Sequence, residues 1–297
     1  MTSHQRTIRR SIHCTGIGLH SGLKVSLALK PAAADTGIRF LRADLGIEIP
    51  ATLEHLGPRQ VLQTSLVKGG ASVDTVEHLL SALRGLGIDN VVVELNQSEV
   101  PIMDGSAAPW VYLIQEAGVK ELIAPRKVLR VTRAVTVEKG DKSISIFPSE
   151  AFKVSYAIAF DHPMLRSQKK TLDITETSFI NEIAPARTFG FLKEVEMLRQ
   201  RGLALGGSLD NAVVLGETGV LNPLRFEDEF VRHKMLDAIG DLALVGHQIL
   251  GHVSVQRGGH ALHTELAAEL LRNTESWTLV DAPLPAGQRV PATANNF

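Results

Sequence analysis

Three residues late in the chain have the types and the spacing of metal ligands. His233, Asp237 and Asp241 lie four residues apart, so on an α-helix they would form one stripe. Far upstream, His78 supplies a second imidazole, with the carboxylate of Glu77 beside it. Two histidines and one aspartate would leave a fourth zinc position open for water, which a nearby glutamate could deprotonate. The sequence therefore indicates a hydrolytic metal enzyme.

Each part of this set also has an ordinary explanation. A His-x-x-x-Asp spacing is common on solvated helix faces and is a weak metal signal by itself. Glu77 could cap its own helix, because Asp74 precedes it with capping-box spacing. His78 could be a hydrogen-bonded helix histidine. Their joint occurrence favours the metal site, since His78 lies at the edge of an apolar helix face, where an unpaired imidazole is costly to bury.

His260 is a candidate general acid. It follows the glycine pair at 258–259, a flexible approach that lets an imidazole project into a cleft, and it precedes a helix expected at 265–272. Asp241 could orient this histidine and stabilise its cation. The alternative is a loop histidine in solvent, and His263 fits that alternative better.

Further residues could bind a substrate. Lys234 could neutralise a phosphate or a carboxylate, or it could be solvated. Thr188 could donate its hydroxyl to an oxyanion, or it could be a β-branched strand residue. The segment 188–214 reads as an insertion rich in Phe, Leu and Gly, and it includes Phe189 and Phe191. Such an insertion would form either a passage for an acyl chain or a second small core.

Two parts of the sequence have a similar organisation. Alternating apolar residues predict a strand, a turn and a second strand over 6–30 and again over 127–148. The two segments look like weak copies of each other, a hint of duplication. Each is followed by a helix candidate, one from about Asp74 to Gly85 and one from about 227 to 245. One ligand helix in each half places the site between the halves, where ligand sites are common.

These patterns define the expected domains. The charged stretch at 120–127 is the expected boundary, which gives an N-terminal domain over 1–124 and a C-terminal domain over 125–297. The tail at about 282–297 has no periodicity, and we expect it to be flexible.

Composition excludes some classes of function. The 297 residues include 31 Lys and Arg against 32 Asp and Glu, for a formal net charge of −1, and aromatic residues are only 5%. This balance does not support a nucleic-acid binder. The single cysteine, Cys14, permits neither an internal disulfide nor a CxxC metal site. Without a signal peptide or an apolar run of ~20 residues, we expect a soluble, cytoplasmic protein with no stable membrane insertion.

Six segments together resemble a known family. The most specific is Leu-Arg-Phe-Glu-Asp-Glu-Phe-Val-Arg-His-Lys-Met-Leu-Asp-Ala-Ile-Gly-Asp at 224–241, and the others are Thr-Val-Glu-His-Leu at 75–79, Pro-Ile-Met-Asp-Gly-Ser-Ala at 101–107, Ala-Arg-Thr-Phe-Gly-Phe at 186–191, Gly-Gly-Ser at 206–208 and Gly-His-Ala-Leu at 259–262. They closely resemble the zinc-dependent UDP-3-O-acyl-N-acetylglucosamine deacetylases, over about residues 3–280. These enzymes carry out the committed step of lipid A synthesis in Gram-negative bacteria.

The resemblance implies an α+β fold and a reaction. Each of two similar domains would have a β-sheet packed with two helices, and the active site would lie between them. The reaction would be hydrolysis of the acetamide of UDP-3-O-acyl-N-acetylglucosamine, which gives acetate and UDP-3-O-acyl-glucosamine. One Zn²⁺ per chain would be held by His78, His233 and Asp237.

The resemblance also implies roles for the surrounding residues. Glu77 would be the general base, and His260 the general acid or electrostatic partner, oriented by Asp241. Thr188 would help to stabilise the oxyanion, and the 188–214 insertion would hold the acyl chain. The substrate contacts would come from Lys234, Phe160, Lys142, Phe189 and Phe191.

Two other functions are compatible with parts of the pattern. A non-catalytic binder of acylated sugar nucleotides would need the cleft, but not Glu77, Asp241 and His260 together. A zinc peptidase would be expected to carry H-E-x-x-H on one helix, and this chain has no such string. We expect a monomer that acts on a small-molecule substrate and does not bind nucleic acid.

Overall fold

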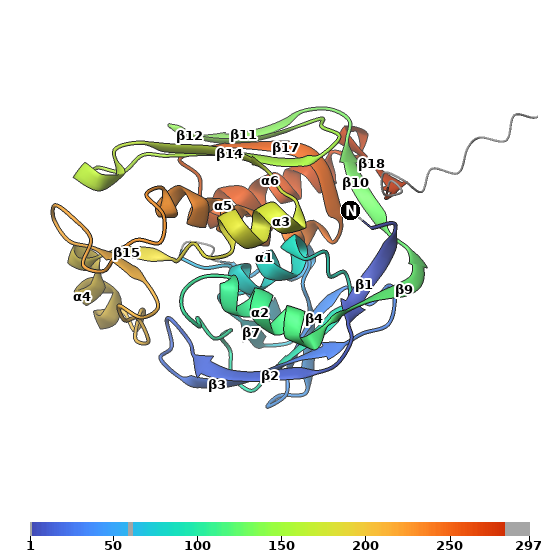
Figure 1. The fold of residues 1–297 in the computed structure, drawn as a ribbon, viewed down its shortest axis with the longest axis horizontal. Helices are drawn as coiled ribbons and strands as arrows, with labels where there is room; N and C mark the ends of the chain where they lie inside the picture. Colours follow the sequence, from blue (N-terminus) through green and yellow to red (C-terminus); the bar gives the residue numbers. More distant parts are fainter. Residues whose placement is uncertain (1, 59–61, 283–297) are drawn as a thin grey trace, which may run out of the picture.

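Two β-sheets enclose two layers of helices in this protein (Figure 1). The structure is a computed structural model, and it describes residues 2–58 and 62–282. Helices α1 and α2 lie next to one sheet, and α5 and α6 lie next to the other. The predicted α+β class is confirmed. The expected tail lies outside the described residues, except for residue 282.

The first sheet is built from the N-terminal part of the chain. Its strand order is β2-β3-β8-β4-β5, and neighbouring strands are antiparallel except for the parallel pair β4 and β8. One helix, α1, precedes the central strand β8, and a second, α2, follows it. The elements are β2 (Ile12–Ile17), β3 (Lys24–Pro31), β4 (Ile38–Arg42), β5 (Ile47–Pro50), α1 (Glu77–Gly85), β8 (Val91–Leu95) and α2 (Ala108–Ala117).

The second sheet repeats this arrangement. Strands β11, β12, β17, β13 and β14 adjoin in this order, and β13 and β17 are the parallel pair. Helix α5 precedes β17 and α6 follows it, so the hint of duplication is confirmed at the level of topology. The elements are β11 (Val135–Lys139), β12 (Lys142–Phe147), β13 (Phe152–Ile158), β14 (Gln168–Asp173), α5 (Glu229–Leu242), β17 (Gln248–Gln256) and α6 (His260–Arg272).

A ribbon of strands joins the two halves. Strand β9 pairs with β1, and after one residue the chain continues into β10, which pairs with β17 and β18 in the second sheet. The expected boundary after residue 124 falls within this ribbon, and it stays a prediction. The strands are β1 (His4–Ile8), β9 (Val119–Pro125), β10 (Lys127–Val131) and β18 (Trp277–Asp281).

Two smaller units complete the fold. The segment expected as an insertion forms a parallel strand pair with a helix between the strands, at the left of Figure 1. A short hairpin of β6 and β7 leads towards α1. The elements are β15 (Phe189–Phe191), α4 (Leu192–Gln200), β16 (Val213–Leu215), β6 (Leu66–Lys68), β7 (Ala71–Val73) and the short α3 (Glu176–Ser178). In the described part of the chain, no helix has the length and apolarity to cross a membrane.

The contact between α1 and α5 brings the two halves together. Their apolar side chains, including Leu79, Leu83, Leu236 and Ile239, are at most 1% exposed and belong to one continuous core. At the crossing, Gly240 of α5 lies directly against the first residue of α1. A Cβ at position 240 would be 2.8 Å from the carbonyl carbon of that residue, so only glycine permits this approach.

Candidate metal centre and active site

Glu77 opens helix α1 but does not cap it. The preceding turn contains Thr75 with a φ of 57°, which a β-branched residue rarely adopts. The N-cap is Val76, with no side-chain hydrogen bond. The capping-box interpretation with Asp74 is therefore wrong: the Glu77 Oε2 atom accepts the backbone N–H of Thr64 at 3.0 Å instead. The other oxygen of the buried Glu77 carboxylate, Oε1, does not take part in this hydrogen bond.

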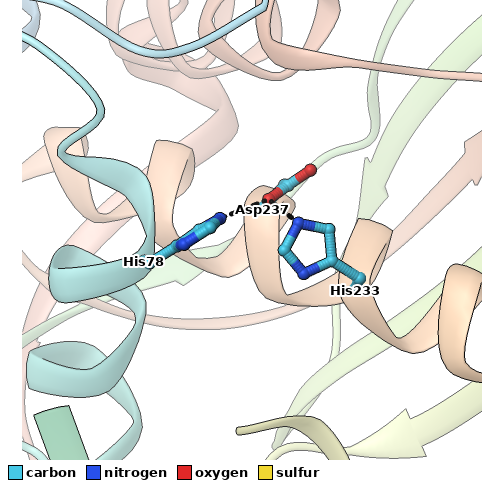
Figure 2. A group of neighbouring side chains, drawn as sticks. All are labelled: His78, His233 and Asp237. Atoms are coloured by element: carbon cyan, nitrogen blue, oxygen red, sulfur yellow. Dashed lines mark ion pairs between the residues drawn. The ribbon is translucent and has the colours of Figure 1, made fainter. Parts of the chain in front are cut away.

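Helix α5 carries the predicted stripe into the interior. His233 and Asp237 are each 2% exposed and Asp241 is fully buried, while His78 of α1 is 5% exposed. Figure 2 shows the two imidazoles converging on the carboxylate of Asp237 from different helices. Residues more than 150 positions apart in the sequence thus meet because α1 packs on α5.

Both histidines lie at distances from Asp237 that are close to those between tetrahedral zinc ligands. Asp237 Oδ1 lies 3.2 Å from His233 Nε2 and 3.7 Å from His78 Nε2. Ligands about 2.05 Å from a zinc ion in a tetrahedral site are about 3.3 Å apart, which agrees with both distances. The two rings stand edge to face, with centroids 4.9 Å apart and an interplanar angle of 86°.

The hydrogen bonds of this group leave its lone pairs unsatisfied. His233 Nδ1 lies 3.0 Å from the carbonyl oxygen of Ala186, so the ring proton resides on Nδ1 and the lone pair of Nε2 faces Asp237 when the ring is neutral. Asp237 Oδ1 is buried and accepts no hydrogen bond from the described residues. Buried lone pairs facing one another repel, and a cation between them removes that cost. The residues therefore fit a metal ion.

Glu77 and His260 face the same space from the other side. Glu77 Oε1 lies 3.9 Å from His260 Nε2, and burial raises the pKa of the Glu77 carboxyl. Burial also opposes the charge of His260, but the carboxylates of Asp241 and Asp237 outweigh it and raise the pKa of His260 to about 9. At neutral pH this arrangement places a carboxyl of raised basicity beside an imidazolium.

Asp241 is the centre of a buried hydrogen-bond network. Its Oδ2 accepts hydrogen bonds from Nδ1 of His260 and Nδ1 of His263, each at 2.8 Å. Its Oδ1 accepts the hydroxyl of Thr64 at 2.5 Å. These three donors satisfy both oxygens of Asp241, so this carboxylate needs no ion. The expected orienting role of Asp241 towards His260 agrees with this geometry.

Known proteins carry the same sequence pattern over nearly the whole chain. A family profile described as "UDP-3-O-acyl N-acetylglycosamine deacetylase" matches residues 5–272. A curated protein from Pseudomonas entomophila (strain L48), named UDP-3-O-acyl-N-acetylglucosamine deacetylase, is 54% identical over 282 residues, which cover 93% of each protein. The matched range includes all the residues of the site described above.

The chain belongs to this deacetylase family. Membership confirms the resemblance found in the sequence and agrees with a hydrolytic enzyme whose centre can bind a metal. The roles of single residues in this member of the deacetylase family stay predictions.

Sequence reasoning misjudged two histidines of this deacetylase. His263 was expected in solvent, but it is fully buried, with Nε2 2.9 Å from the hydroxyl of Tyr156. His260 was expected in a loop before a helix at 265–272, but α6 begins at His260 itself. The spacing of three between these histidines was the available signal, since it places both on one helix face. Tyr156, on a strand of the second sheet, had no local signal.

Thr188 follows the peptide that orients His233, and Lys234 contacts the metal ligand Asp237. Thr188 lies two residues after Ala186, whose carbonyl orients His233. The backbone N–H of Thr188 donates to the carbonyl of Gly105 at 2.8 Å, which fixes the backbone at this residue. Lys234 was given a solvated alternative, and that alternative is wrong: its Nζ donates to Asp237 Oδ2 at 2.8 Å, and its side chain is 19% exposed. The second oxygen of Asp237 is thus neutralised by a lysine.

The aromatic residues expected to contact substrate form one cluster. The Phe160 ring lies 5.9 Å from the ring of Phe189 and 5.8 Å from that of Phe191, centroid to centroid. Phe189 also stands 6.3 Å from the His233 ring, and Lys234 Nζ is 5.5 Å above its face. The cluster therefore extends from the metal ligands into the β15–α4–β16 unit.

The outer parts of the expected substrate region are more open. A hollow of about 660 Å³ runs along α4. It is lined by Leu192, Val195, Glu196, Arg199 and Gln200. Lys142 begins β12, and the next residue, Ser143, pairs with Gln256 at the end of β17. The chain reaches His260 four residues after Gln256. Contact of Lys142 with a nucleotide stays a prediction.

Proposed function

We propose that this chain hydrolyses the acetamide of UDP-3-O-acyl-N-acetylglucosamine, releasing acetate and UDP-3-O-acyl-glucosamine, in the committed step of lipid A biosynthesis in the cytoplasm. Membership of the deacetylase family supports this reaction. The single structural observation that carries it is the buried convergence of His78, His233 and an unsatisfied oxygen of Asp237. A carboxyl and an imidazolium lie beside that group, as acid–base hydrolysis requires.

The metal is proposed to be zinc, held by His78, His233 and Asp237. Two imidazoles and one carboxylate form a common catalytic zinc set that leaves one position open. Bound there, zinc would supply Lewis acidity, which polarises a carbonyl and acidifies a water molecule. The Lys234 ammonium would remain on the second oxygen of Asp237 and keep its first oxygen directed at the metal.

Glu77 is the proposed general base. Its Oε2 is held by the Thr64 N–H, so Oε1 is the atom that takes a proton from the attacking water. Because burial raises the pKa of this carboxyl, it accepts a proton more readily than an exposed glutamate would.

His260 is the proposed electrostatic partner. When water adds to the acetamide carbon, the carbonyl oxygen gains negative charge, and the His260 cation and the Thr188 hydroxyl would stabilise it. Asp241 keeps the imidazolium oriented through the Nδ1 hydrogen bond. The departing amine then receives a proton from His260 or from protonated Glu77.

The rest of the substrate would extend away from the metal. The 188–214 segment is proposed to hold the acyl chain, with Phe189 beside the metal ligand His233 and Phe191 next to it in the aromatic cluster. Lys234, Phe160 and Lys142 are the proposed contacts for the sugar nucleotide.

An acetate-release assay tests the proposal. Purified protein is incubated with an acylated UDP-N-acetylglucosamine before chelation, after chelation and after zinc is added back. We expect one acetate per substrate consumed, loss of release on chelation and recovery with zinc. Substrate binding without any acetate release would refute the proposal and favour a non-catalytic binder.

A further inference from the structure

Glu229 is a buried charge that the mechanism above does not use. It lies in the first turn of α5, and its side chain is fully buried. Its Oε1 accepts the backbone N–H of Arg187 at 3.0 Å and the Nε of the same residue at 2.9 Å. Its Oε2 accepts the backbone N–H of Arg225 at 2.6 Å and Nη2 of Arg187 at 3.2 Å. Four donors on one carboxylate hold two separate chain segments in place.

One of these donors belongs to the peptide group that orients a metal ligand. The N–H of Arg187 and the C=O of Ala186 are parts of the same planar peptide unit, and in a trans peptide they point in opposite directions. The N–H end bonds to Glu229, and the C=O end accepts the Nδ1 proton of His233. Glu229 and His233 lie one turn apart on α5, so a single peptide group spans the turn and joins them.

We propose that Glu229 is a positioning residue for the metal centre. By holding the Ala186–Arg187 peptide, it keeps the carbonyl aimed at His233 Nδ1, and so keeps the lone pair of His233 Nε2 directed at the metal position. Without the hydrogen bond to Glu229 the peptide could rotate. The tautomer and the ring orientation of His233 would then no longer be fixed. The inference rests on the proposed metal centre. It also explains what Arg187 and Glu229 do in the two sequence motifs that contain them.

A matched pair of variants separates this role from general stability. Glu229→Gln removes the charge and replaces one accepting oxygen with an amide that cannot accept. Asp89→Asn also removes a carboxylate charge that holds a peptide N–H and an arginine, at a partly buried position where Asp89 Oδ2 accepts the Arg6 N–H at 2.7 Å and the Arg126 Nη2 at 2.7 Å. That group contains none of the proposed metal or catalytic residues, so it serves as the control.

Zinc affinity is the decisive measurement, made by competition with a chromophoric chelator, alongside the melting temperature of each metal-free protein. We expect Glu229→Gln to bind zinc about 10–100-fold more weakly than the wild type, as is usual when a partner of a ligand is removed. Asp89→Asn should have a lower melting temperature than the wild type but the same zinc affinity. Equal zinc affinity in Glu229→Gln and wild type would overturn the positioning role.

Two further outcomes are informative. If Glu229→Gln does not fold, Glu229→Asp keeps the charge beside Arg187 but shortens the reach to the peptide N–H, and it should also bind zinc more weakly; wild-type affinity in that variant would overturn the inference. A wild-type protein that binds no zinc would refute the metal centre itself, which is a failure of the proposed function.

Discussion

Replacing Gly240 with alanine should separate the two halves of the metal centre. An added Cβ would overlap the carbonyl oxygen of Glu77 and would lie 2.8 Å from the carbonyl carbon of the same residue. A carbon and an oxygen atom in contact prefer at least ~3.3 Å, so α1 must move from α5 by more than about 1 Å to remove the overlap. Glu77 and His78 move with α1, whereas His233 and Asp237 stay on α5.

The size of the effect follows from two competing contributions. Alanine has a higher helix propensity than glycine by about 1 kcal/mol, which stabilises the variant. Overpacking a core costs about 1–3 kcal/mol, and backbone atoms cannot swing aside as a flexible side chain can, so we expect net destabilisation. For activity, a displacement of about 1 Å in a catalytic group costs about 10²-fold, so a shift of this size should lower kcat/KM by about 100-fold.

The assay measures kcat/KM for acetate release, zinc content after dialysis and melting temperature. Gly219→Ala is the control, because an added Cβ at Gly219 has no atom within 4 Å and its φ is not positive. If Gly240→Ala keeps the activity and zinc content of the control, the close approach of α1 to α5 does not set the geometry of the site.

Three further predictions test single groups. Glu77→Gln keeps an oxygen for the Thr64 N–H but removes the base, so it should bind one zinc and lose about 10²–10⁴-fold in kcat; wild-type turnover would exclude Glu77 as the base. His233→Ala should retain less than one zinc per chain by metal analysis after dialysis, and a full equivalent would contradict its role as a ligand. Burial raises the pKa of the Cys14 thiol from 9.0 to about 11, so below pH 9 the reactive thiolate is about 100-fold scarcer than in the unfolded chain. Iodoacetamide at pH 8 should therefore modify native Cys14 about 100-fold more slowly than the unfolded protein and faster as pH rises towards 11, and equal rates would contradict this.

The parts of the site that sequence could predict are those encoded by spacing within one helix. His233, Asp237 and Asp241 repeat every fourth residue, and this spacing alone places them on one face of α5. The packing of α5 on α1 could also be predicted, because each half of the sequence carries one helix with ligand residues. The resemblance to a known family then assigned roles that spacing alone leaves open.

Contacts between distant segments carried no local signal. Thr64 donates to Asp241 from a loop before α1, and Tyr156 reaches His263 from the middle of β13. Neither residue differs in sequence from an ordinary loop threonine or strand tyrosine. The capping-box error at Glu77 has the same origin. The local sequence matches a capping box, but the Glu77 carboxylate accepts the backbone N–H of Thr64, which lies outside that pattern.

The charges of the buried site explain why His260 is cationic at a place that disfavours a cation. It begins α6, and a helix N-terminus disfavours positive charge by about 0.3–1 kcal/mol, less than one pKa unit. Burial acts in the same direction, yet Asp241 at 2.8 Å and Asp237 at 3.8 Å raise its pKa to about 9. Three carboxylates share this volume, so a divalent ion together with the His260 imidazolium would balance them when all three are ionised. The Lys234 ammonium would then remain in excess, and this surplus favours a substrate that carries negative charge, as a sugar diphosphate does.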